Sequence, residues 1–196
     1  VLCCAGDGDA YAEGLDHLIF GAKRNTDITV IVHNNRVYGL TTGQYTPTSP
    51  LGFRGKSTPQ GAPEEPFNPL ILMLASGAGF VARSTSRKMP HLSGIIGQAL
   101  RHKGFSYVDV LQICATYFNV SELYDRQGYE LSGHDPSDFS AACAKAEEWD
   151  YNSDAPIAFG LFYQEEKPSF EERFSRHPAS PGSRKEQIRA FLEMKR

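Results

Sequence analysis

Two short segments near the start of the chain carry side chains suited to holding a diphosphate through a divalent cation. The first is Gly6-Asp7-Gly8-Asp9, and the second, Asn34-Asn35-Arg36-Val37, follows after one predicted helix and one predicted strand. Asp7 would supply a carboxylate oxygen, Asn35 an amide oxygen and Val37 a backbone carbonyl. Mg²⁺ prefers an all-oxygen shell of this kind, completed by phosphate oxygens and water. The two segments therefore predict a magnesium–diphosphate site.

The residues around these three ligands support the same interpretation. Gly8 leaves out a side chain where the backbone must approach a phosphate closely. In Tyr38-Gly39-Leu40-Thr41, the Thr41 hydroxyl can donate to a phosphate oxygen, and Leu40 is a candidate to support a bent cofactor. The combination predicts thiamine diphosphate. The predicted cofactor-binding residues are Asp7, Gly8, Asp9, Asn35, Val37, Gly39, Leu40 and Thr41.

A strand–helix–strand unit is expected to bring the two segments together. Residues 1–5 form an apolar run that predicts a buried strand, and residues 27–32 predict a second strand. Between them, apolar residues recur at i, i+3, i+4 and i+7 from Leu15, which indicates a helix with one apolar face. Such units are right-handed. Ligands bind at the carboxyl ends of their strands, which is where both segments fall.

The rest of the chain alternates predicted helices and strands. Helices are predicted over residues 68–75, 90–103, 138–149 and 184–195, and strands over residues 80–83, 107–114 and 157–163. Residues 43–66 are rich in Gly, Pro, Ser and Thr and predict a long loop. The alternation predicts an α/β fold, a mostly parallel sheet with helices on both faces. We expect residues 1–163 to form the cofactor-binding domain and residues 164–196 a helical extension of it.

The composition argues against a nucleic-acid-binding protein and against a membrane-spanning one. A formal net charge of −3 provides no basic field for nucleic acid, and no apolar run is long enough to span a membrane. The four cysteines (Cys3, Cys4, Cys114 and Cys143) are scattered, which favours a reducing, cytoplasmic location. The chain opens inside an apolar run without an initiator Met, so we expect it to be a fragment of a longer subunit that lacks an N-terminal portion.

Several further segments carry a family resemblance. They are residues 22–27 (AKRNTD), 38–44 (YGLTTGQ), 46–48 (TPT), 101–105 (RHKGF), 109–114 (DVLQIC) and 165–168 (EEKP). Together with the Gly-Asp-Gly turn and the Asn pair, they resemble the β subunit of 2-oxoacid:ferredoxin oxidoreductases over nearly the whole chain. The YGLTTGQ run is the most specific of them. Thr42 stands where several relatives that use 2-oxoglutarate carry Lys, which weighs slightly against that substrate.

The resemblance implies an enzyme that decarboxylates a 2-oxoacid oxidatively to acyl-CoA and CO₂. Electrons would pass through a [4Fe–4S] cluster to ferredoxin. Cys114 matches one of the four cysteines that hold the cluster in this family, and the other three are expected upstream of Gly6. This chain alone would then be unable to hold the cluster.

The resemblance also implies a partner. No side chain of this sequence is a credible acid–base carboxylate for activating the cofactor, so the catalytic residues on this chain stay unknown. In thiamine enzymes the activating Glu comes from a pyrimidine-binding domain. We expect it on an α (or fused α/γ) subunit, with the active site at the interface and the isolated chain inactive.

Other interpretations remain open at this stage. A non-redox thiamine diphosphate enzyme, of the 2-oxoacid decarboxylase or acetolactate synthase type, shares the Gly-Asp-Gly turn and the Asn. A non-catalytic nucleotide-binding domain is disfavoured because Tyr11 stands at the third glycine position of Gly-x-Gly-x-x-Gly. Asp7 could be a simple turn carboxylate and Cys114 a small buried hydrophobe. Cys3, Cys4 and Cys143 are expected to serve packing.

Overall fold

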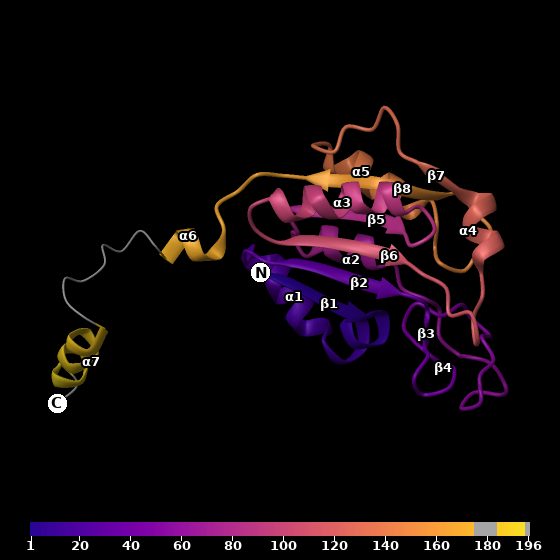
Figure 1. The fold of residues 1–196 in the computed structure, drawn as a ribbon, viewed down its shortest axis with the longest axis horizontal. Coiled ribbons are helices and arrows are strands. Elements are labelled where there is room, and N and C mark those ends of the chain that lie inside the picture. Colours follow the sequence, from indigo (N-terminus) through magenta and orange to yellow (C-terminus); the bar gives the residue numbers. More distant parts are fainter. Residues whose placement is uncertain (175–183, 195–196) are drawn as a thin grey trace.

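The computed structural model describes residues 1–174 and 184–194. Its frame is a six-stranded sheet with the strand order β1-β2-β6-β5-β8-β7 (Figure 1). The strands are β1 (Leu2–Gly6), β2 (Thr29–Asn34), β6 (Ser106–Leu111), β5 (Phe80–Thr85), β8 (Ile157–Gln164) and β7 (Gly128–Glu130). Strands β1, β2, β6 and β5 pair in parallel, as do β7 and β8, whereas β8 runs antiparallel to β5. The predicted α/β fold with a mostly parallel sheet is confirmed.

Helices cover both faces of this sheet. The helices that pack on it include α1 (Leu15–Arg24), α2 (Pro69–Ala75), α3 (Met89–Arg101) and α5 (Phe139–Glu147). Helices α1, α2 and α5 share one apolar cluster with Val30 and Tyr107 of the sheet. Helix α3 packs on the opposite face, in a cluster that includes Ile31 and Val108. Val30 and Ile31 are neighbours on β2 that point to opposite faces, because side chains alternate along a strand.

The carboxyl ends of four strands meet at one edge of the sheet. Gly6 at the end of β1 pairs with His33, Asn34 at the end of β2 pairs with Leu111, and Leu111 pairs with Thr85. Immediately after β1 the chain turns into a short π-helix, η1 (Asp9–Glu13), which leads into α1. The predicted strand–helix–strand unit is therefore present. It places the Gly-Asp-Gly turn beside the Asn pair.

The first strand differs from its prediction, because β1 lies at the edge of the sheet. Leu2, Cys3 and Cys4 are exposed, and only Ala5 and Gly6 are partly buried. Among the described residues β1 pairs with β2 alone, and the short helix η1 contacts it near its carboxyl end, where Ala5 joins the core. The predictions of a buried first strand and of a packing role for Cys3 and Cys4 are wrong for this reason.

The sixth strand ends earlier than predicted. β6 stops at Leu111, and its last contact with the neighbouring strand is the Gln112 amide, which donates to the Asn34 carbonyl at 2.9 Å. Because β2 also ends at Asn34, no partner is left for a longer strand. Cys114 instead forms an isolated backbone bridge with Phe118.

Residues 43–66 form mostly turns, as expected, with one addition. β4 (Gln44–Tyr45) pairs antiparallel with β3 (Val37–Tyr38), which makes a small hairpin after the Asn pair. The helix α4 (Ser121–Gln127) and strand β7 were not predicted.

Two further helices follow β8. α6 (Phe170–Phe174) and α7 (Arg184–Glu193) bury none of their residues. The predicted terminal helix is confirmed up to Glu193, and its last residue, Lys195, lies outside the described residues. None of the helices in residues 1–174 and 184–194 is long and apolar enough to cross a membrane.

Candidate functional site

Asp7 lies at the carboxyl end of β1 and is buried, with 2% of its surface exposed. The Thr48 hydroxyl donates to its Oδ2 at 3.2 Å. Burial raises the pKa of Asp7 to about 6, against the opposing effect of hydrogen bonds from the side chains of Thr46 and Thr48 and from backbone amides including that of Asn35. No ion pair within residues 1–174 and 184–194 includes Asp7. The carboxylate is thus desolvated without a positively charged partner in the described part of the chain.

Asn35 and Val37 lie next to this carboxylate. The Asn35 side-chain oxygen accepts from the Val37 amide at 3.1 Å, so the two predicted ligands are held in one tight turn. The structure therefore brings Asp7, Asn35 and Val37 together. Among the described residues no group of three or more His, Cys, Asp or Glu side chains could hold a metal ion. A cation here would rely on one carboxylate with amide and carbonyl oxygens, and these donors fit Mg²⁺.

The close approach at Gly8 is made by a tyrosine ring. A Cβ atom built on Gly8 would lie 2.0 Å from Cε1 of Tyr38, so only glycine fits under this ring. The Tyr38 hydroxyl donates to the Glu13 carboxylate at 3.0 Å. Partial burial and the neighbouring Glu13 raise the pKa of Tyr38 to about 12. Tyr38 is thus a neutral, apolar cover over the Gly-Asp-Gly turn.

The turn between β3 and β4 carries the other predicted contacts. Leu40 is fully exposed, at 100%, and so does not belong to the apolar core of the described residues. The Thr41 hydroxyl donates to the Tyr38 carbonyl at 3.3 Å. Thr42 and Gly43 have φ values of 67° and 97°, which produce a sharp turn that displays Leu40 and Thr41 at its tip. Both side chains are accessible to a ligand or partner.

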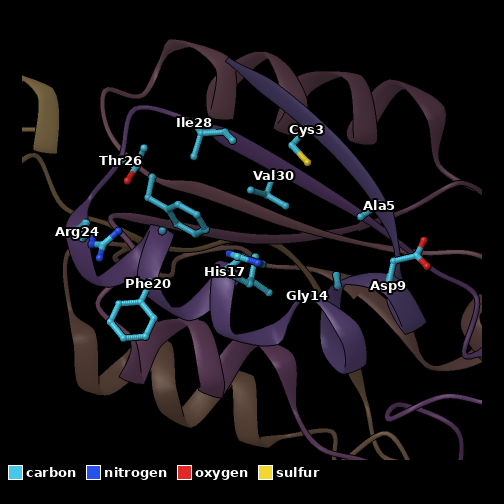
Figure 2. Close-up of a pocket in the computed structure, with 14 residues that line it drawn as sticks. Cys3, Ala5, Asp9, Gly14, His17, Phe20, Arg24, Thr26, Ile28 and Val30 are labelled. Atoms are coloured by element: carbon cyan, nitrogen blue, oxygen red, sulfur yellow. The ribbon is translucent and has the colours of Figure 1, made fainter.

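Asp9 is exposed and accepts a hydrogen bond from the Gly6 amide at 3.3 Å. It also borders a cavity of about 410 Å³ between the edge of the sheet and α1 (Figure 2). The cavity is mostly apolar, with Cys3, Val30 and Phe20 among its lining residues. Asp9 is its one member of the predicted cofactor-binding set. This cavity is therefore a groove next to the predicted site, and it is separate from the site around Asp7.

The cysteines are not gathered in one place. Cys114 is partly buried beside the site, where its Sγ atom would lie 3.8 Å from a Cβ atom built on Gly39. Cys3 and Cys4 lie on the edge strand, and Cys143 packs on α5 against the core as predicted. Of the four cysteines, Cys114 is therefore the one that lies beside Gly39 of the predicted cofactor site.

A buried polar network behind the site was missed by the sequence analysis. The Arg83 and Asp109 side chains face each other on β5 and β6, with Nε 3.2 Å from Oδ2. The Tyr151 hydroxyl donates to the same Oδ2 at 2.6 Å, and the hydroxyls of Tyr11 and Tyr107 bond to each other close by. One signal was present: a charged residue stands inside each of two apolar strands, and buried charges are normally paired.

This network touches the cation site through Asn34. The Asn34 side-chain amide donates to Asp109 Oδ1 at 3.0 Å, and its oxygen accepts from the Thr48 hydroxyl at 2.9 Å. Thr48 also contacts Asp7. The site is therefore built on a polar scaffold that extends to the centre of the sheet.

Family models match both parts of the chain. Residues 1–110 match the thiamine pyrophosphate enzyme C-terminal TPP binding domain, and residues 114–178 match the C-terminal part of the pyruvate ferredoxin oxidoreductase beta subunit. The first match covers more than half of the chain and includes the Gly-Asp-Gly turn and the Asn pair.

Individual relatives agree with these models. The 2-oxoacid:ferredoxin oxidoreductase subunit beta of Saccharolobus solfataricus is 40% identical over an alignment of 196 residues. The alignment covers 92% of this chain and 63% of the relative. The 2-oxoglutarate synthase subunit KorB of Methanothermobacter thermautotrophicus is 47% identical over 118 residues, covering 60% of this chain and 41% of that protein. The chain thus spans less than two thirds of the length of these relatives.

A solved structure shows the same fold. The 2-oxoglutarate:ferredoxin oxidoreductase from Magnetococcus marinus, with 2-oxoglutarate, coenzyme A and succinyl-CoA bound, superposes with a TM-score of 0.86 at 32% identity. The superposition covers 96% of this chain and 67% of that one. The chain described here therefore belongs to the thiamine pyrophosphate-binding domain family, as a β subunit of the 2-oxoacid:ferredoxin oxidoreductase type.

Proposed function

We propose that this chain is the thiamine diphosphate-binding catalytic subunit of a ferredoxin-linked 2-oxoacid oxidoreductase. The reaction is the oxidative decarboxylation of a 2-oxoacid to acyl-CoA and CO₂, with electrons passed to ferredoxin. The observation that carries the proposal is the buried Asp7 carboxylate, which lies beside Asn35 and has no cationic partner in the described residues. The names of the relatives support the same activity.

Each predicted site residue has a binding role in this proposal. Asp7, the Asn35 side chain and the Val37 carbonyl hold Mg²⁺ against the diphosphate. Gly39, Thr41 and the backbone amides of Gly8 and Asp9 line the diphosphate, and Leu40 supports the bent cofactor from the tip of the turn. Thiamine diphosphate supplies, when bound, the carbanion that attacks the keto carbon and the ring that accepts electrons.

Tyr38 has to be accommodated in the same proposal. Its ring lies on Gly8, in the space above the Gly-Asp-Gly turn, and its hydroxyl donates to the exposed Glu13. Its hydrogen bond to Glu13 keeps the hydroxyl directed outward, away from the cation ligands.

Cys114 is the proposed ligand of the [4Fe–4S] cluster on this chain. It is supported by its position beside Gly39, close to the tip that would contact the cofactor. Cluster thiolates are normally four in number. Three further cysteines, upstream of Gly6 in the family, would complete the set.

A partner subunit is part of the proposal. An α (or fused α/γ) subunit would carry the pyrimidine-binding domain and the activating Glu. The full exposure of Leu40 at the tip of the β3–β4 turn supports a partner surface there. The proposed complex acts on a 2-oxoacid and CoA in the cytoplasm. Relatives are named for 2-oxoacids in general and for 2-oxoglutarate, so both groups of substrate are to be tested.

The test uses the whole β subunit purified with its partner subunit. We would record anaerobic reduction of ferredoxin or a viologen dye with CoA and a panel of 2-oxoacids, for the wild type and for Asp7→Ala. The expected result is CoA-dependent reduction that is lost in the variant. Release of CO₂ without electron transfer would instead identify a non-redox thiamine enzyme. Unchanged activity in Asp7→Ala would contradict the assigned cation site.

A further inference from the structure

Three polar side chains stand in series behind Asp7. The Thr48 hydroxyl lies 3.2 Å from Asp7 Oδ2 and 2.9 Å from the Asn34 side-chain oxygen. Asn34 in turn donates to Asp109 Oδ1 at 3.0 Å. All four residues are buried. The series connects the proposed cation ligand to the buried ion pair at the centre of the sheet.

The orientation of the Asn34 amide is fixed by this series. Its nitrogen must face the Asp109 carboxylate, because a carboxylate is only an acceptor when ionised. Rotating the amide by half a turn would place its oxygen against that carboxylate. The Asn34 oxygen is therefore left to face Thr48, as the structure shows.

Thr48 then has two acceptors and one proton to donate. A hydroxyl carries a single O–H but can also accept. Both the Asn34 oxygen and Asp7 Oδ2 lie within reach of it. The hydroxyl can donate to both oxygens only through a three-centre hydrogen bond, in which its one proton is shared between the Asp7 carboxylate and the fixed amide.

Thr48 is also held through its backbone. Arg36 Nε donates to the Thr48 carbonyl at 2.8 Å, and the Ser49 hydroxyl donates to the Arg36 carbonyl at 2.6 Å. Arg36 is itself buried, with its guanidinium over the rings of Phe118 and Trp149. The Thr48 backbone is therefore held by Arg36, while its hydroxyl is held by the Asn34 side chain.

We propose that Thr48 is a positioning residue for the cation ligand Asp7. It transmits the fixed geometry of Asn34 and of the Arg83–Asp109 pair to the Asp7 carboxylate, so that the carboxylate is already oriented when Mg²⁺ and the diphosphate arrive. The inference rests on the proposed function, because only there is Asp7 a ligand of Mg²⁺. Partners that orient a metal ligand typically contribute about 10- to 100-fold to metal affinity.

The experiment measures Mg²⁺ affinity in the whole β subunit with its partner. Thr48→Val keeps the shape of the side chain and removes the hydroxyl, whereas Thr48→Ser retains it. Thr58→Val is a matched control in the same long loop, because the Thr58 hydroxyl is buried and finds no hydrogen-bond partner in the described part of the chain. Mg²⁺ would be titrated calorimetrically at a fixed concentration of thiamine diphosphate, and each melting temperature recorded without Mg²⁺.

We expect Thr48→Val to weaken Mg²⁺ binding by at least about tenfold, while Thr48→Ser and Thr58→Val stay close to the wild type. Recovery in Thr48→Ser is the readout that a purely packing role would not produce. If Thr48→Val does not fold, Thr48→Ala tests the same loss of the hydroxyl with a smaller side chain. A Thr48→Val protein that binds Mg²⁺ as tightly as the wild type would overturn the inference.

The inference and the proposed function fail in different ways. If the wild type shows no Mg²⁺-dependent binding of thiamine diphosphate, the proposed function itself is wrong. If the wild type binds, Asp7→Ala does not, and Thr48→Val binds normally, only the positioning role of Thr48 is refuted.

Discussion

Asp7 and Asp109 are both buried carboxylates, but in the described part of the chain only Asp109 has a cationic partner. Asp109 bonds to the Arg83 guanidinium and to Tyr151, so its charge is balanced inside the sheet. Asp7 accepts hydrogen bonds but has no cation beside it in the described residues, and burial raises its pKa to about 6. A buried charge is costly unless it is paired or coordinates a metal. The contrast between the two sites is the physical argument for a cation at Asp7.

Burial has the opposite effect on the pKa of His102, a basic side chain that follows α3. Neither ring nitrogen has a hydrogen-bond partner within residues 1–174 and 184–194, and the ring centroid lies 5.6 Å from that of Phe80. Burial lowers the pKa of His102, Lys167 adds to the effect, and the carboxylates of Glu166 and Asp27 oppose it. The folded state therefore disfavours the protonated ring.

This shift predicts how stability depends on pH. The unfolded chain binds a proton at His102 near the ordinary pKa of about 6.5, whereas the folded chain resists protonation at that pH. Stability from the neutral ring is thus fully present above pH 6.5 or so and is lost as the pH falls below it. We expect urea unfolding to show a shallower loss of stability between about pH 6.5 and 5 in His102→Leu than in the wild type.

His91 provides the comparison for this prediction. Its pKa is also lowered by burial, but its Nδ1 has a hydrogen-bond partner in Ser84 at 2.8 Å. His91→Leu measures how much of the slope comes from this second ring. Equal slopes in the wild type and in His102→Leu would show that His102 is protonated as easily in the folded state as in the unfolded one.

At the scale of elements, one residue joins three parts of the fold. Asn25 ends α1 in the left-handed conformation, with φ 55°. Its side-chain oxygen accepts from the Phe105 amide at 2.9 Å, just before β6. Its side-chain nitrogen donates to the carbonyls of Lys167 and Pro168, at 3.1 and 3.2 Å, in the segment that follows β8. The helix end, the start of β6 and this segment are thus joined by one amide.

We expect Asn25→Ala to lower the free energy of unfolding by about 3 kcal/mol. Three hydrogen bonds of about 1 kcal/mol each are lost, and the left-handed conformation adds a cost of about 1 kcal/mol for alanine, part of which relaxation would offset. Asn25→Gly loses the same hydrogen bonds but adopts this conformation easily. It should therefore be more stable than Asn25→Ala when both are unfolded in urea. Equal stability of the two variants would show that the backbone conformation contributes nothing.

The elements also show what the sequence could and could not predict. Apolar runs and spacings, together with turn and helix-start residues, located β1, α1, β2 and the helices α2, α3 and α5, because these signals are local in the sequence. The end of β6 depends on where β2 ends, and the exposure of β1 depends on its place in the strand order. Neither is encoded locally. The same holds for the Arg83–Asp109 pair, which only the parallel register of β5 and β6 brings together.

The cation site also combines residues that the local sequence predicts with one that only the tertiary structure reveals. Asp7, Asn35 and Val37 could be predicted from their residue types and their positions at strand ends. Thr48 could not, because it reaches Asp7 from a long loop 41 residues further along the chain. A loop without periodicity gives no indication of which of its hydroxyls points inward.

At the scale of the whole molecule, the edge of the sheet at β1 is open on both faces. Cys3 and Cys4 are adjacent on the strand and so point to opposite faces, yet both are exposed. One face opens onto the apolar cavity that Cys3 lines together with α1 (Figure 2). Cys143 lies on α5, which packs on β8, and is partly buried against the core; burial together with Glu147 raises the pKa of its thiol.

This difference predicts the order in which the thiols react. Because the thiolate is the reactive form and must be accessible, we expect Cys3 and Cys4 in the folded chain to be alkylated by a maleimide at least about tenfold faster than Cys143. Peptide mass spectrometry over a time course would give the three rates separately. The same chain in guanidinium chloride is the control, since unfolding should make the rates similar. Protection of Cys3 and Cys4 equal to that of Cys143 would contradict the exposure of both thiols and would mean that the edge strand is covered in solution.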